Sequence, residues 1–210
     1  YGTKPKEAVA TAREQVAGLL NCRPAEVIFT SGGTESNNHA ILGLVRCLRE
    51  NGNHIITSSF EHPAVFEVCG HLGRNGFDVT YLPVGSEGLV DPADVAAAVR
   101  PTTILISIMH ANNAVGTVQP LADSRRVARE HGIALHTDAA QSVGKIPTDV
   151  QTLGVDMLSM AGQKVYAPKG VGALYVRASL NPANFCLGAG QENGRRAGTE
   201  NVMGIVGLGK

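Results

Sequence analysis

Short apolar runs alternate with amphipathic, helix-like segments along nearly the whole chain of 210 residues. The run at 103–109 is almost unbroken in apolar residues, as expected for a strand that is covered on both faces. Strands that alternate with helices predict a parallel sheet with helices on each side. We therefore expect a three-layer α/β/α fold around a mostly parallel, mixed sheet of about seven strands.

The periodicity of the apolar residues places each expected element. The strands are expected at 26–30, 54–58, 79–83, 103–109, 133–138, 157–160 and 172–176. The helices are expected at 6–20, 36–50, from 63 onward, at 91–99 and at 121–130, with another at the C-terminal end. No repeat or linker divides the chain, so we expect a single domain over residues 1–210. Because both ends fall in helical patterns, we expect that domain to be truncated at each end.

Composition excludes several classes of protein. Lysine plus arginine equals aspartate plus glutamate at 18 each, and tryptophan is absent, so neither nucleic acid nor an anionic membrane is an expected partner. No apolar run approaches the ~18 residues that a membrane-spanning helix needs. The 4 cysteines are scattered without a Cys-x-x-Cys pair, which predicts neither a zinc site nor a disulfide framework. A reducing, cytoplasmic setting is expected.

Polar residues gather where the expected strands end. The clusters lie at 31–35, 61–62, 110–113, 138–141 and 162–164. In open α/β sheets the carboxyl ends of the strands form the edge at which ligands bind. The sequence therefore predicts one ligand site built from these loops.

The first cluster contains Ser31, Gly32, Gly33 and Thr34 between a strand and a helix. Glycines let the backbone approach an anion, and a helix N-terminus offers free N–H groups, so a phosphate is the natural guest. A simple helix cap is the alternative. The stretch is neither a Walker A loop nor a dinucleotide-binding glycine motif, and at 188–194 that motif fails because Asn193 takes the place of the third glycine.

Asp138 ends an apolar strand, where an unpaired carboxylate is costly, so a cationic partner is expected. A metal, an arginine or lysine, and a protonated ring nitrogen are all candidates. His110 and His136 lie nearby, but no third ligand is obvious, so no metal is expected.

Three other polar residues allow both a functional and an ordinary interpretation. Lys164 follows a buried strand, where it is either a Schiff-base amine or a solvated side chain. His62 opens a helix and can stack on a planar ligand, shuttle protons or simply face solvent. Asn113 can bind a ligand carboxylate or help to form a turn.

Taken together, these motifs resemble those of the cysteine desulfurases and selenocysteine lyases, in the class-V branch of fold-type I pyridoxal-phosphate (PLP) enzymes. The matching stretches follow the family's order and cover essentially the whole chain. They are Phe-Thr-Ser-Gly-Gly-Thr-Glu-Ser-Asn-Asn at 29–38, Glu-His at 61–62, Ser-Ile-Met-His-Ala-Asn-Asn at 107–113, His-Thr-Asp-Ala-Ala-Gln-Ser at 136–142, Gln-Lys-Val-Tyr-Ala-Pro-Lys-Gly at 163–170 and Arg-Ala-Gly-Thr-Glu-Asn at 196–201.

The resemblance implies a role for each matching position. Lys164 and His62 would be catalytic, Lys164 as the Schiff-base amine that takes the α-proton and His62 as the ring-stacking group that assists proton transfer. Asp138 would pair with the ring nitrogen. The cofactor-binding set it implies is Gly33, Thr34, His62, Asn113, Asp138, Gln141, Gln163, Lys164 and Thr199, with Gln141 at the phenolic oxygen and Thr199 reaching the phosphate of a partner subunit in a homodimer.

The implied activity is PLP-dependent cysteine desulfuration, in which L-cysteine becomes L-alanine and its sulfur passes to an acceptor or scaffold protein, as in iron–sulfur cluster assembly. Selenocysteine lyase, class-V aminotransferase and a non-catalytic binding module with this fold are the alternatives. In the family a C-terminal small domain carries the persulfide cysteine and the substrate-carboxylate arginine. None of the cysteines here lies in a matching motif. We therefore expect residues 1–210 to be the PLP-binding large domain without the small domain, and to be inactive alone.

The sequence departs from the family next to the reactive amine. The family has serine or alanine, glycine and histidine before the lysine, whereas this chain has Ala161, Gly162 and Gln163. Ala161 lacks a hydroxyl for the phosphate, and Gln163 replaces an imidazole with an amide that never carries charge. Weaker cofactor binding or altered activity is the resulting hypothesis.

Overall fold

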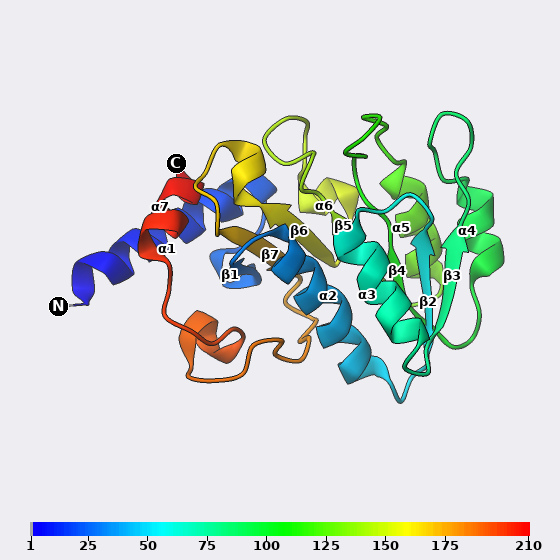
Figure 1. Cartoon of the computed structure of the whole chain (residues 1–210), viewed down its shortest axis with the longest axis horizontal. Coiled ribbons are helices and arrows are strands. Elements are labelled where there is room, and N and C mark those ends of the chain that lie inside the picture. The colour runs from blue at the N-terminus through cyan, green and yellow to red at the C-terminus, as the bar shows by residue number, and fades with distance from the viewer. Residues whose placement is uncertain (1) are drawn as a thin grey trace.

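The computed structural model describes residues 2–210, and Tyr1, with which the expected domain begins, lies outside the described residues. A seven-stranded sheet in the order β1-β7-β6-β5-β4-β2-β3 runs through the molecule (Figure 1). Its strands are β1 (Val27–Thr30), β2 (His54–Ser58), β3 (Asp78–Leu82), β4 (Thr103–Ser107), β5 (Ala134–Asp138), β6 (Met157–Ala161) and β7 (Gly172–Val176). The mixed α/β fold expected from the sequence is confirmed.

Helices connect most of the strands. They are α1 (Thr3–Leu20), α2 (Gly33–Leu48), α3 (Pro63–Gly73), α4 (Pro92–Ala98), α5 (Leu121–Glu130), α6 (Val150–Leu153) and α7 (Val202–Gly209), with short 3-10 helices η1 (Pro24–Glu26), η2 (Gly162–Val165) and η3 (Gln191–Gly194). Asp91 caps α4 as expected, since its side chain accepts the Ala93 N–H at 2.8 Å. Among residues 2–210, every helix is too short or too polar to cross a membrane.

Two hydrophobic clusters define the three layers. One cluster packs α2 and α3 onto one face of the sheet, through residues such as Ile41, Leu44 and Val65. The other packs α1, α4, α5 and α7 onto the opposite face, through residues such as Leu20 and Val127. Because both faces are covered, the central strands are buried along their whole length, which explains their unbroken apolar runs.

Strand direction determines where the loops meet. β2, β3, β4, β5 and β6 pair in parallel, and only β7 runs against its neighbours β6 and β1. The carboxyl ends of β1 and of the five parallel strands therefore lie at the same edge of the sheet.

The predicted start of the helix expected at 36–50 is wrong. The helix α2 begins at Gly33, because the Ser36 N–H donates to the Gly32 carbonyl at 3.0 Å and closes a first turn. The two glycines suggested a longer loop than the chain forms. Thr34 and Glu35 consequently lie in the first turn of a helix, which changes what their backbone can bind.

Candidate functional site

A cavity of about 500 Å³ opens at the carboxyl edge of the sheet. All five predicted polar clusters contribute to its wall, from the loops after β1, β2, β4, β5 and β6. Its lining residues are Ser31, Gly32, Gly33, Thr34, Glu35, Asn37, His62, Ala64, Met109, Ala111, Asn113, Asp138, Ala140, Gln141, Ala161, Gln163, Lys164, Lys169 and Gly170. A cavity thus lies at the edge where the ligand site was predicted, and its volume is typical of small-molecule pockets.

Every predicted site residue except Thr199 lines this cavity. Thr199 lines a second, smaller cavity of about 120 Å³, which shares Ser31 and Gly170 with the first. Its side chain is exposed to solvent. Within one chain, therefore, Thr199 lies beside the main cavity and does not contribute to its wall.

Asp138 lies in the wall of the cavity and is only 4% exposed. Its Oδ2 accepts from the Asn37 Nδ2 at 2.7 Å, and its Oδ1 accepts from the Ala140 N–H at 2.9 Å. Among residues 2–210, no lysine or arginine pairs with it. Burial raises the pKa of Asp138, and the two hydrogen bonds oppose that rise. The sequence allowed a metal, an arginine or lysine, or a protonated ring nitrogen as its cationic partner. Because no arginine or lysine among these residues takes that place, the cation would come from a bound ligand.

Both histidines near Asp138 are engaged in the core. His136 bonds through Nδ1 to Ser107 Oγ at 2.8 Å and through Nε2 to Ser159 Oγ at 3.0 Å, and burial lowers its pKa to about 3. His110 bonds through Nδ1 to Ser142 Oγ at 2.9 Å. Among residues 2–210, no group of three His, Cys, Asp or Glu side chains could hold a metal ion.

The N-terminus of α2 forms one wall of the cavity at Gly33 and Thr34. The first N–H groups of a helix have no acceptor inside it and point outward with the positive end of the dipole. A Cβ at Gly33 would lie 3.1 Å from the Ala161 Cβ, so glycine lets the loop after β1 approach β6 closely. This wall has the chemistry of a phosphate cradle.

Lys164 reaches the cavity from η2, directly after β6. Gly162 sets that position, since a Cβ there would lie 2.7 Å from the Val171 carbonyl oxygen. Gln163 also lines the cavity, as does a second lysine, Lys169, to which the sequence pattern assigned no role. The cavity therefore holds two amines, of which Lys164 lies at the end of a core strand.

Three further predicted residues line the cavity. His62 caps α3, where its Nδ1 accepts the Ala64 N–H at 3.1 Å, so the Nε2 carries the proton of the neutral ring. Asn112 forms the turn after β4 by accepting the Ala114 N–H at 2.8 Å, which leaves Asn113 at the cavity. Gln141 accepts from the Lys145 Nζ at 3.2 Å.

Two residues that orient the site were assigned no role from sequence. Asn37 holds Asp138, and its own Oδ1 is buried without a partner among the described residues. Glu61 ties the loop of His62 to the end of β4, because its Oε1 accepts the Met109 N–H at 2.9 Å. Helical spacing gave a signal for Asn37, which lies one turn after Gly33 and so shares its face.

The donor set of the cavity fits PLP. A helix N-terminus suits the phosphate, a buried carboxylate without a cation suits a protonated pyridine nitrogen, and a lysine amine suits the aldehyde. Asp138 is the most specific of these features, because burying a carboxylate is costly and, among residues 2–210, two hydrogen bonds but no lysine or arginine compensate its charge.

Comparisons with known proteins agree with this geometry. The family described as aminotransferase class-V matches residues 1–210. The cysteine desulfurase IscS of Dictyoglomus turgidum is 52% identical over 210 residues, which are 100% of this chain and 53% of that protein. A solved structure described as SspA in complex with cysteine has 50% identity and a TM-score of 0.95, covering 98% of this chain and 60% of that one. A NifS-like protein has 40% identity and a TM-score of 0.96, covering 99% of this chain and 57% of that one.

These relatives confirm the resemblance to cysteine desulfurases that the motifs indicated. The chain spans about half the length of the curated relatives that it matches, as the 53% coverage of the Dictyoglomus protein illustrates.

Proposed function

The chain belongs to the aminotransferase class-V family, and from this premise we propose that it forms the PLP-binding part of a cysteine desulfurase. In this proposal the protein converts L-cysteine to L-alanine and passes the sulfur to an acceptor. The single observation that carries it is Asp138, which is 4% exposed, has no lysine or arginine partner among residues 2–210 and lines the same cavity as Lys164.

When bound, PLP supplies an electron sink for negative charge that develops at the α-carbon of an amino acid. The residues of this chain would hold it at its three ends. The N-terminus of α2 at Gly33 and Thr34 binds the phosphate, Asp138 keeps the ring nitrogen protonated, and Lys164 provides the amine for the aldehyde. Asn37 in turn orients Asp138 through its 2.7 Å hydrogen bond.

Four further residues complete the proposed site. His62 covers one face of the ring and moves a proton, and Gln141 donates to the phenolic oxygen. Asn113 contacts the cofactor and the substrate carboxylate. Gln163 takes the place of an imidazole near the phosphate, which it can still reach with a neutral N–H donor. All four line the same cavity, which supports their common role.

Cysteine is the substrate that we favour, because a relative of 50% identity has a solved structure described as a complex with cysteine. The sulfur acceptor belongs to the same proposal, as does a homodimer in which Thr199 reaches the partner's phosphate. The exposure of Thr199 beside the cavity supports that dimer. A cytoplasmic location is also proposed, supported by four cysteines that are all free.

The proposal is tested by supplying the complete protein with PLP, L-cysteine and a thiol reductant. Alanine and sulfide should form in equal amounts, and Asp138→Asn should reduce their rate by more than about a hundredfold, because a neutral amide no longer stabilises the ring charge. Cys47→Ser is a matched control, because Cys47 is exposed at the end of α2 and outside the cavity.

The alternatives give different products when L-selenocysteine and a keto acid, as amino-group acceptor, are supplied in parallel reactions. An aminotransferase would yield a keto acid without sulfide, and a selenocysteine lyase would release selenide while leaving L-cysteine intact. A protein that binds PLP but forms no product from any of these substrates would be a non-catalytic module. Any of these three results contradicts the desulfurase assignment.

A further inference from the structure

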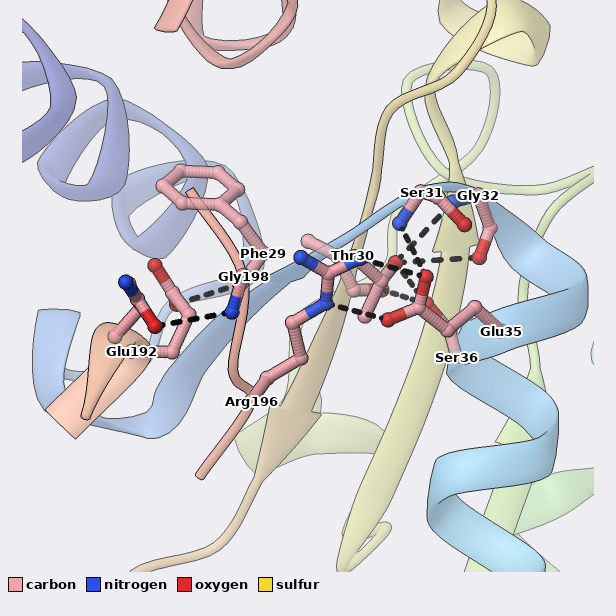
Figure 2. Close-up of polar contacts among 11 residues, drawn as sticks. Phe29, Thr30, Ser31, Gly32, Glu35, Ser36, Glu192, Arg196 and Gly198 are labelled. Carbon is pink, nitrogen blue, oxygen red and sulfur yellow. Dashed lines mark hydrogen bonds and ion pairs between the residues drawn. The ribbon is translucent and has the colours of Figure 1, made fainter. Parts of the chain in front are cut away.

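An ion pair joins the first turn of α2 to the loop before α7. Arg196 donates through Nε to Glu35 Oε1 at 2.7 Å and through Nη2 to Glu35 Oε2 at 3.1 Å, so the pair is bidentate (Figure 2). The same Oε2 accepts the Ser31 N–H at 2.9 Å. The two side chains are only 22% and 12% exposed, which shields them from screening by solvent.

This pair stands between the two cavities. Glu35 lines the large cavity beside Gly33 and Thr34, whereas Arg196 lines the small cavity together with Thr199. The residues are 161 positions apart in sequence. The pair is therefore the direct side-chain link between the phosphate cradle and the loop that presents Thr199.

The charge of Glu35 lies close to where a phosphate would bind. Burial alone raises the pKa of Glu35, but the hydrogen bonds from Arg196 and Ser31 outweigh it and hold the pKa below its usual range. Glu35 is thus ionised at neutral pH. An ionised carboxylate beside a phosphate repels it unless a cation compensates, and Arg196 is the cation in contact with Glu35.

Arg196 also begins a loop that is fastened at several points. The Gly198 N–H donates to Gln191 Oε1 at 3.0 Å, and Asn201 Nδ2 donates to the Gly170 carbonyl at 3.2 Å. Asn201 additionally caps α7 by accepting the Gly204 N–H at 3.1 Å. The exposed Thr199 lies between these anchors, so the position of Arg196 helps to set where Thr199 points.

We propose that Glu35 and Arg196 act as a positioning pair for the cofactor phosphate. Arg196 cancels the charge of Glu35 beside the cradle and fixes the loop that carries Thr199. Affinity for the phosphate then depends on the pair as a unit. This inference rests on the proposed function, since it takes PLP as the ligand.

The test measures dissociation constants of PLP and of pyridoxal, which lacks the phosphate, for the complete protein. Arg196→Gln should weaken PLP binding about tenfold, within the range seen for coupled neighbours, and should change pyridoxal binding little. Glu35→Gln should weaken PLP binding less than Arg196→Gln does, because it removes the carboxylate charge that repels the phosphate together with the ion pair. The double variant should bind PLP more tightly than Arg196→Gln alone, and Arg196→Lys should recover part of the affinity.

The Asp156–Arg177 pair provides a matched control. Arg177 Nε lies 3.0 Å from Asp156 Oδ1, and the side chains are 32% and 21% exposed. These residues flank the opposite end of β6 and β7, away from both cavities of interest. Arg177→Gln should lower the melting temperature without changing the affinity for PLP.

Several outcomes overturn the inference. The inference is wrong if Arg196→Gln leaves the affinity for PLP unchanged, or if that variant loses as much affinity for pyridoxal as for PLP. It is also wrong if the effects of the Glu35 and Arg196 substitutions on PLP affinity simply add. If Arg196→Gln does not fold, Arg196→Lys replaces it, and it should lose affinity for PLP but not for pyridoxal. A wild-type protein that binds no PLP refutes the proposed function and this inference with it, whereas wild-type binding with an indifferent Arg196 refutes the inference alone.

Discussion

Glu61 is a buried acid whose pKa makes folding stability depend on pH. Its Oε1 accepts from Ser58 Oγ at 2.7 Å and from the Met109 N–H at 2.9 Å, while Oε2 is buried without a partner among the described residues. Burial raises its pKa from 4.5 to about 8, and the charge of Asp138 adds to the rise. Glu61 is therefore neutral at pH 7.

Glu61→Gln should flatten the pH dependence of stability. In the wild type, the unfolded chain loses this proton near pH 4.5 while the folded chain keeps it up to about pH 8, so the free energy of unfolding falls as pH rises through that window. Urea unfolding at several pH values measures the slope. A slope in Glu61→Gln as steep as in the wild type would show that Glu61 is ionised in the folded protein.

Gln163 is the departure nearest to the reactive amine. Gln163→His should tighten PLP binding by several-fold, because an imidazolium can supply the charge-assisted hydrogen bond that a neutral amide lacks. Titration of the protein with PLP measures the change, and pyridoxal serves as the control without a phosphate. Unchanged affinity would mean that the amide already satisfies the phosphate.

At the residue scale, sequence predicted the amine and the carboxylate but not the contacts that orient them. Asp138 was singled out because an unpaired carboxylate at the end of an apolar strand is costly, whereas the role of Lys164 followed from the resemblance of the motifs to a known family. The pairing of Glu35 with Arg196 was not predictable, since it joins residues 161 positions apart through a loop without periodicity.

At the scale of elements, the junction of β7 with the loop after β1 shapes the phosphate cradle. A Cβ at Gly172 would lie 2.7 Å from the Gly32 Cα and 2.7 Å from the Met160 carbonyl oxygen. The first residue of β7 is therefore a glycine because the loop after β1 passes directly against it. Close approach of the two backbones holds the N-terminus of α2 at the cavity.

Gly172→Ala should displace that loop. We expect a loss of ~1–3 kcal/mol in the free energy of unfolding, together with weaker PLP binding. Gly190→Ala is the control, because a Cβ there meets nothing within 4 Å and its φ of −84° suits any residue. Chemical unfolding and PLP titration measure both effects, and equal behaviour of the two variants would contradict this role of Gly172.

Strands and helices were predicted well where periodicity was strong, and their ends less well. The strand expected at 103–109 ends at Ser107, because beyond it the backbone leaves the regular ladder, although His110 still donates to the Asp138 carbonyl at 2.9 Å. The order of the strands depends on contacts between distant elements, which local patterns do not contain.

At the scale of the whole molecule, the proposed dimer makes each site depend on two chains. Thr199→Ala should weaken PLP binding about tenfold, as expected for the loss of a hydrogen bond to a charged group. Co-expression with Lys164→Ala subunits should restore wild-type affinity at one site of each hybrid dimer, where an intact Thr199 meets an intact Lys164. Hybrids that bind PLP as weakly as the Thr199→Ala dimer would contradict a contribution across the interface.

We propose Lys164 as the amine that binds PLP, and labelling can test this directly because a second amine, Lys169, lines the same cavity. The protein is incubated with PLP, reduced with borohydride to make the bond to the lysine permanent, digested, and analysed by mass spectrometry. We expect the added mass of the pyridoxyl phosphate on Lys164, and its loss in Lys164→Ala. A label on Lys169, or no label on any lysine, would show that Lys164 is not the amine that binds PLP.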